Sequence, residues 1–223
     1  MDDDKKRNIL NIVFSIIIVA IVTLLIYFGY NYAQVFLSSK EAADFVDDFE
    51  KRVGETEPKA DEEKNNSGEN SSDADNENGA INEKNNSAIT YSNEQYTVLG
   101  TMSIPKINFK YPILQEQSQE ALNKAVVVLY GVGLNKPGNT VVIGHNYMNG
   151  KLFSNNKKLE VGDQIFVTDN LGKKLTYTIY NKFEADPDDA SFYVRDTNGV
   201  AELTLSTCTD NSQKRIIILA KAQ

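Results

Sequence analysis

An uninterrupted apolar run near the N-terminus is the feature that most constrains how this chain can fold. The twenty residues from Ile9 to Phe28 contain no charged side chain and are dominated by Ile, Val and Leu. A helix of about 20 apolar residues spans the hydrocarbon core of a bilayer. The apolar region of a signal peptide is shorter, roughly 7 to 15 residues, and ends at a small-residue cleavage site, which is not found here. We therefore expect a membrane-spanning helix.

Basic residues flank this apolar run on one side. Lys5, Lys6 and Arg7 precede it, and the next basic residue, Lys40, comes well after its end. The positive-inside rule then places residues 1–8 in the cytoplasm as a short tail and the remaining chain outside. The sequence predicts a single-pass protein of the cell membrane, held by Ile9 to Phe28, with an extracellular folded part.

Two segments separate the span from the next apolar-rich region. In residues 29–53, Ser38 and Glu41 fit a capping box, and apolar residues recur at helical spacing up to Val53. We expect this segment to be a helical stalk that acts as a spacer. Residues 54–88 are rich in Asn, Ser, Asp and Glu. They cannot bury enough apolar surface to offset the entropy of folding, which predicts a disordered linker.

The negative charge of the chain is concentrated in that linker. Residues 54–88 hold ten acidic and three basic side chains, whereas residues 89–223 hold thirteen acidic and fourteen basic ones. Most of the overall net charge of −8 therefore comes from the linker, and it does not indicate a basic partner for the folded part. No basic patch is interleaved with aromatic residues, so we do not expect nucleic-acid binding.

Residues 89–223 are long enough for one domain with a sizeable core. Most of this region consists of short runs rich in Val, Ile, Thr, Tyr and Phe, separated by turn signals such as Asn149-Gly150 and Asn198-Gly199. One helix is expected at Gln117 to Lys124 and a further helical turn near Gly150 to Asn155. This pattern favours a mainly β barrel or sandwich. We expect strands at residues 97–104, 109–114, 140–144, 164–168, 174–185, 202–207 and 215–220.

Chemically distinctive side chains are few in this region. The chain holds one cysteine, Cys208, and one histidine, His145, each at the end of an expected strand, while Arg215 opens another. A cysteine nucleophile needs a thiolate, and a nearby imidazole is the usual means of obtaining it. A buried cysteine, a structural histidine and a surface arginine are the alternative interpretation. Metal binding is not indicated, because a single His and a single Cys 63 positions apart lack zinc-site spacing, and no cofactor is expected.

Several motifs in this region resemble the sortase family. The string TLSTC at Thr204 to Cys208 is followed seven positions later by Arg215, and a GHN motif at Gly144 to Asn146 precedes both. The resemblance runs from about Gly100 to the C-terminus and includes the stretch LGTMSIPKINFKYPIL. The chain order His, Cys, Arg matches sortases, whereas in papain-like enzymes the cysteine precedes the histidine.

The resemblance implies a mainly β fold, an eight-stranded barrel with one or two short helices, and a cysteine transpeptidase activity. It implies that Cys208 attacks a C-terminal sorting signal, LPxTG-like or NPxTx-like, on a surface protein and forms a thioester. His145 would exchange protons with the leaving and incoming amines, and Arg215 would stabilise the oxyanion, with Arg195 as the alternative. The acceptor would be an amine of a peptidoglycan precursor or a pilin.

The same comparison suggests substrate contacts and a subclass. Asn146, Leu205 and Thr207 lie within the two motifs, and we expect them to bind substrate. GHNYMNGKLF and TLSTC look like class B sortases, but residues 186–199 are too short for the long helix of that class and are nearer to class A or class D. Class C is disfavoured, since no aromatic-bearing lid segment precedes the barrel and no C-terminal membrane span follows it.

Two other interpretations account for the same residues. A non-catalytic extracellular β-domain that binds wall polymer or a partner protein would keep Cys208 buried and unreactive. An L,D-transpeptidase is also an extracellular cysteine acyltransferase, but such enzymes usually carry His and Gly-Cys close together, a pattern absent from this sequence.

Overall fold

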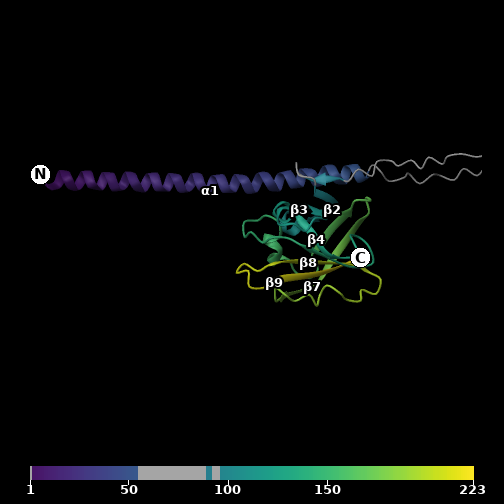
Figure 1. The fold of residues 1–223 in the computed structure, drawn as a ribbon. Helices are drawn as coiled ribbons and strands as arrows, with labels where there is room; N and C mark the ends of the chain where they lie inside the picture. The colour runs from purple at the N-terminus through teal and green to yellow at the C-terminus, as the bar shows by residue number, and fades with distance from the viewer. Residues whose placement is uncertain (1, 55–88, 92–95) are drawn as a thin grey trace, which may run out of the picture.

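The computed structural model describes residues 2–54, 89–91 and 96–223 (Figure 1). Apart from Gly54, the expected disordered linker lies outside the described residues. The helices and strands are α1 (Asp2–Gly54), β1 (Thr90–Tyr91), β2 (Tyr96–Ile104), η1 (Pro105–Ile107), β3 (Phe109–Leu114), α2 (Gln119–Lys124), β4 (Val126–Gly131), β5 (Gly138–Ile143), η2 (Phe153–Lys158), β6 (Gln164–Asp169), β7 (Lys174–Ala185), β8 (Ala201–Cys208) and β9 (Arg215–Ala222), where η marks a 3-10 helix.

Strands β2 to β9 form a closed barrel. They follow the order β2-β3-β4-β5-β8-β9-β7-β6, and antiparallel pairing of β2 with β6 closes the ring. Two neighbouring pairs, β3–β4 and β5–β8, are parallel. The two-residue strand β1 pairs with the start of β2 outside the ring. The expected eight-stranded β-barrel is confirmed.

The expected strands are all present, with bounds shifted by at most two residues. The eighth barrel strand, β4, was missed because Ala125 alone separates it from α2, so no turn signal marks its start. The expected helix is α2, which starts at Gln119 because the hydroxyl of Ser118 caps it by accepting from the amide of Ala121 at 3.1 Å. The helical turn expected near Gly150 to Asn155 is the 3-10 helix η2.

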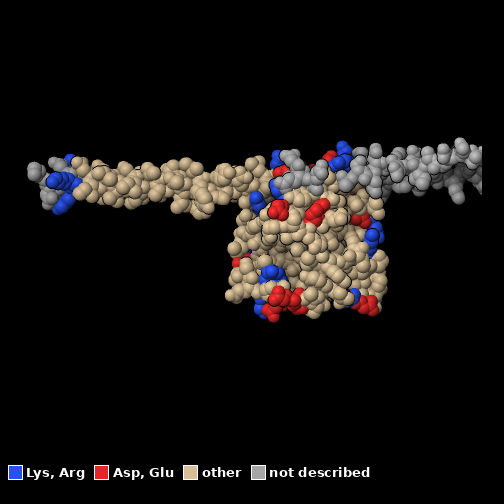
Figure 2. Space-filling model, in the orientation of Figure 1, with Lys and Arg blue, Asp and Glu red and all other residues tan. Residues whose placement is uncertain are grey.

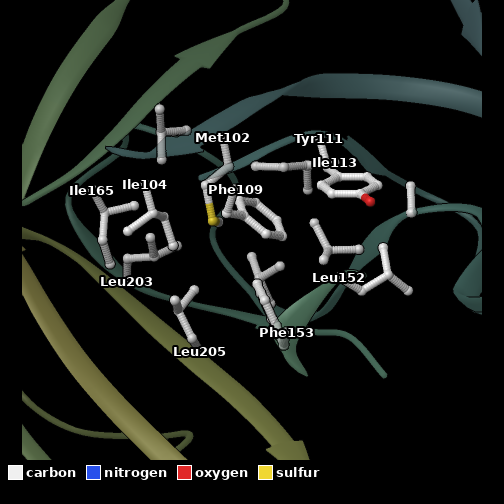
Figure 3. Close-up of a cluster of buried hydrophobic side chains, with 14 of the residues drawn as sticks. Met102, Ile104, Phe109, Tyr111, Ile113, Leu152, Phe153, Ile165, Leu203 and Leu205 are labelled. Carbon is white, nitrogen blue, oxygen red and sulfur yellow. The ribbon is translucent and has the colours of Figure 1, made fainter. Parts of the chain in front are cut away.

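Alternating side chains of the strands fill the barrel (Figure 3). Met102 and Ile113 from neighbouring strands belong to the same buried cluster as Leu203 and Leu205 from β8, and all four are at most 1% exposed. Leu205 therefore belongs to the core, and its predicted contact with substrate is wrong. The period of two along β8 sends Leu203 and Leu205 inwards, so that Cys208 emerges on the opposite, outer face of the barrel.

Helix α1 continues without a break from the N-terminal tail through the apolar run and the expected stalk. Its most apolar window has a mean hydropathy of 3.1, and none of that window is buried against the protein. Figure 2 shows Lys and Arg side chains at the N-terminal end of the helix, followed by a length of helix surface without charge. By length and composition, this helix can cross a membrane.

The C-terminal part of α1 packs along the barrel, which corrects the expectation that residues 29–53 act as a spacer over their whole length. Ala42, Val46 and Phe49 have no exposed surface and recur every three or four residues, so they form one face of the helix. The ring of Phe45 lies 4.9 Å from that of Tyr91, centroid to centroid. Residues 42–53 of the expected stalk thus contribute to the core of the folded domain, whereas residues 29–37 are mostly exposed.

Polar contacts border this apolar face of α1. The hydroxyl groups of Ser39 and Tyr111 lie 3.0 Å apart, and Lys110 forms an ion pair with Asp47. These contacts tie α1 to β3, one of the strands it covers. Together with the buried face they fix the orientation of α1 on the barrel.

The substitution Phe49→Ala tests whether α1 is part of the domain. We expect it to lower the free energy of unfolding by about 3–5 kcal/mol, the usual cost of removing a buried phenylalanine. The measurement is chemical denaturation of the full chain in detergent, followed by tyrosine fluorescence. Phe36→Ala, which truncates a largely exposed ring on the same helix, is the matched control. Equal denaturation midpoints for both variants would restore the spacer interpretation.

Candidate active site

His145 and Cys208 lie at the ends of two neighbouring parallel strands. In the β5–β8 pair Ile143 is opposite Ser206, and the amide of Gly144 donates to the carbonyl of Ser206 at 3.3 Å. Two residues further along, the same register places His145 beside Cys208. Parallel strands end at the same edge of a sheet, so the two side chains share one rim of the barrel.

Hydrogen bonds from two side chains clamp these strand ends together. The buried hydroxyl of Thr207 donates to the carbonyl of Gly144 at 2.7 Å. The amide nitrogen of Asn146 donates at 3.0 Å both to the carbonyl of Cys208 and to a carboxylate oxygen of Asp210. Both amide hydrogens of Asn146 are therefore engaged in structural contacts, and its contact with substrate stays a prediction. Thr207 also lines the groove described below, where substrate contact stays a prediction.

Arg215 reaches the cysteine from the next strand. In the antiparallel β8–β9 pair Arg215 is directly opposite Cys208, and its Nη1 donates to the sulfur at 2.9 Å. The short turn between the strands is what produces this register. Arg195, the alternative, binds Glu202 through Nε at 2.7 Å and the hydroxyl of Thr204 at 3.1 Å. Its guanidinium is thus committed to a structural network away from the sulfur.

A groove with a volume of about 270 Å³ runs beside the three predicted catalytic residues. Its apolar lining comes from α2, β4 and the β7–β8 loop, and sequence reasoning missed it because these segments lie far apart in the chain. A more open polar hollow beyond the β8–β9 turn does not contain Cys208. The lining residues of the groove are Leu122, Leu129, Ile143, Gly144, His145, Pro187, Asp189, Phe192, Tyr193, Ser206, Thr207, Cys208 and Arg215.

The imidazole of His145 is partly shielded from water. Burial lowers the pKa of His145 below its usual value near 6.5, so the neutral ring predominates at neutral pH. The amide nitrogen of Gln119 lies 2.8 Å from Nε2, and the ring of Tyr147 lies 5.0 Å away, centroid to centroid. Gln119 lies outside the motifs, and Tyr147 lies within GHNYMNGKLF but was not singled out, because nothing in the sequence indicates that either side chain contacts the imidazole.

The substitution Thr207→Val tests the clamp between the strand ends. It keeps the shape of the side chain but leaves the buried carbonyl of Gly144 without its partner, which costs about 1–3 kcal/mol. We expect a lower free energy of unfolding by that amount in chemical denaturation. Thr176→Val, at a half-buried threonine of β7 outside the clamp, should change it by less than about 0.5 kcal/mol. Equal effects would argue against the clamp.

Comparison with known proteins agrees with this geometry. Residues 102–223 match the family model described as the sortase domain. Sortase A of Bacillus anthracis is 30% identical over 124 residues, which cover 54% of this chain and 58% of the relative. Sortase A of Streptococcus agalactiae serotype III (strain NEM316) is 29% identical over 139 residues, 56% of this chain and 53% of the relative. The match thus spans little more than half of each relative.

Solved structures show the same fold. A lid mutant of sortase A from Corynebacterium diphtheriae superposes with a TM-score of 0.53 at 26% identity, over 58% of this chain and 72% of the other. Sortase D5, a transpeptidase of Clostridium perfringens, gives a TM-score of 0.52 at 26% identity, over 57% and 79%. The family model covers more than half of the chain, and the barrel is shared with these structures. The chain therefore belongs to the sortase family.

Proposed function

We propose that the protein is a membrane-anchored cysteine transpeptidase that cleaves a C-terminal sorting signal and transfers the cleaved protein to an amine of the cell wall. The 2.9 Å contact between Nη1 of Arg215 and the sulfur of Cys208, on the rim shared with His145, carries this proposal. A guanidinium this close stabilises negative charge on sulfur, which is the form that acts as a nucleophile. Family membership supports the same reaction class.

In the first half-reaction the Cys208 thiolate attacks the carbonyl carbon before the scissile bond. A carbon–sulfur bond forms and the carbonyl oxygen takes the negative charge, which Arg215 stabilises with its other N–H donors. As the carbon–nitrogen bond breaks, the His145 imidazolium gives its proton to the leaving amine nitrogen. The products are a thioester on Cys208, a neutral imidazole and a free amine.

The second half-reaction reverses these roles. The acceptor amine attacks the thioester carbon and passes a proton to His145, an amide bond forms, and the Cys208 thiolate is released with an imidazolium beside it. The protein thus needs no cofactor for the transfer. The acceptor we propose is an amine of a peptidoglycan precursor or of a pilin.

The groove favours an extended peptide with apolar side chains. Leu122, Leu129, Phe192 and Tyr193 line it, and such apolar walls with few polar groups suit a short recognition motif. An LPxTG-like signal fits this lining, and an NPxTx-like signal is the alternative. Residues 186–199 form turns and contain no helix. This supports a class A or class D enzyme over class B, and the matched proteins include structures named sortase A, sortase C and sortase D.

Membrane attachment would follow from α1. The basic residues at its N-terminal end favour a cytoplasmic N-terminus, which places the barrel outside the cell beside the wall and its precursors. Substrates held in the same membrane would then reach the enzyme by lateral diffusion in the plane of the bilayer.

The proposal is tested with quenched LPxTG-like and NPxTx-like peptides, incubated with the full chain in detergent, with and without an added amine. We expect cleavage of one peptide class and amine-dependent product formation, both abolished in Cys208→Ala. If every peptide stays intact and an alkylating reagent fails to label Cys208 in the folded protein, the non-catalytic interpretation stands instead.

The substitution Arg215→Ala tests the oxyanion role. We expect kcat to fall by about 10²–10³-fold, the usual loss when one oxyanion donor is removed. Arg215→Lys should recover only part of the rate. The planar guanidinium can donate to the sulfur and to the oxyanion at the same time through different N–H groups, and an ammonium lacks this geometry. The matched control is Lys214→Ala, which removes the exposed cation next to it and should stay within twofold of wild type. Equal losses in the two alanine variants would contradict a specific role for Arg215.

The pH dependence tests the pairing of Cys208 and His145. If thiolate and imidazolium must coexist, kcat/KM is bell-shaped in pH, and its two limbs report the coupled pair. Because burial lowers the pKa of His145, the imidazolium population declines as pH rises from the acid side towards neutrality. A rate that stays constant between about pH 5.5 and 9 would rule out proton transfer by this pair.

A further inference from the structure

One of the two ring nitrogens of His145 already has a protein partner. The side-chain amide nitrogen of Gln119 lies 2.8 Å from Nε2 of the imidazole. In this arrangement the amide donates, Nε2 accepts, and the ring proton of the neutral form sits on Nδ1. The contact therefore selects one tautomer of the only histidine in the chain.

Gln119 is held in place by the way α2 is attached to the barrel. The side-chain amide of Gln117 donates to the backbone carbonyls of Val128 at 2.9 Å and Leu129 at 3.1 Å, both on β4. Ser118 caps the helix, and Ala121 is fully buried beneath it. Gln119, the first helical residue, thus projects from a fixed backbone.

The contact belongs to a closed circuit of side chains. The amide of Gln119 also lies 3.3 Å from Oδ1 of Asn123, which accepts from the hydroxyl of Tyr147 at 2.7 Å. The ring of Tyr147 returns to His145, at 5.0 Å between centroids. The imidazole is thereby restrained at Nε2 and against one aromatic ring, with Nδ1 left free of this circuit.

We propose that Gln119 is the positioning residue of the active site, the group that orients His145 so that Nδ1 exchanges protons with the substrate amines. This inference rests on the proposed function. It follows the general arrangement of covalent catalysis, in which a third group orients the base that serves the nucleophile.

An amide suits this role because it can serve both protonation states of the ring. When His145 is neutral, the N–H of Gln119 donates to Nε2, as in the structure. When His145 becomes an imidazolium, a half-turn of the amide presents Oε1, which accepts from Nε2–H. A carboxylate at this position could only accept, so it would hold a proton on Nε2 in both protonation states of the ring and would raise the pKa of His145.

The test uses nitrogen NMR of the full chain in detergent, labelled at histidine, because a single histidine gives an unambiguous signal. In wild type the neutral ring should be the Nδ1–H tautomer. Gln119→Met, which removes both hydrogen-bonding groups, should give a mixture of tautomers. Gln119→Glu should raise the pKa of His145, since the carboxylate stabilises the imidazolium. Glu120→Gln, the neighbouring change on the same helix, should preserve the wild-type tautomer.

Kinetics give the second measurement. Gln119→Met should lower kcat by about two- to tenfold with KM unchanged, the size expected for one neutral hydrogen bond. Gln119→Glu should shift the dependence of the rate on pH in the same direction as the pKa of His145 measured by NMR, towards higher pH. If the tautomer, the titration and the pH profile are the same in wild type and both variants, the proposal is overturned. If no peptide is cleaved at all, the proposed function fails, while the NMR measurement still decides the role of Gln119.

Discussion

The parallel pairing of β5 with β8 is the constraint on which the site depends. Histidine and cysteine are 63 positions apart, and only a parallel pair delivers two C-terminal strand ends to the same edge. The antiparallel return of β9 then places Arg215 opposite Cys208. Successive side chains of a strand point to opposite faces. A slip of one residue in either pairing would therefore point a predicted catalytic side chain towards the core.

The outer face of β8 and β9 is covered by the β7–β8 loop, and a buried polar network holds that loop. Nη1 of Arg195 donates to the carbonyl of Phe192 at 2.7 Å, and the amide of Asn139 donates to the carbonyl of Tyr193 at 2.9 Å. Glu202 balances the charge of Arg195. The arginine that seemed an alternative catalytic group thus shapes the wall of the groove.

The sequence predicted the parts of this molecule that depend on local pattern. Most strands show alternation or apolar runs between turns, and Cys208 and His145 stand out because each is unique. Leu205 was misplaced because a motif gives the position of a residue and not the face of the strand it occupies. The buried role of Phe49 was missed because its partners come from strands far along the chain.

Gln119 illustrates the same limit at the site itself. Glutamine is common on exposed helices, and nothing in its neighbours along the chain indicates contact with an imidazole. Its position depends on how α2 attaches to β4, and that attachment depends on the tertiary structure of the whole barrel. Such a contact can be predicted only when the register of every strand is known.

The continuity of α1 has a geometrical consequence. Ten residues separate the apolar run, which ends at Phe28, from Ser39, the first polar contact with the barrel. A helix rises about 1.5 Å and turns about 100° per residue. One inserted residue would therefore swing the barrel by nearly a third of a circle around the helix axis. In Figure 1 the turn between β8 and β9 lies on the side of the barrel that faces the N-terminal half of α1. With the apolar run in a bilayer, the length of this helix sets how far the rim that carries Cys208 lies from the lipid. It also sets the direction in which that rim faces around the helix axis.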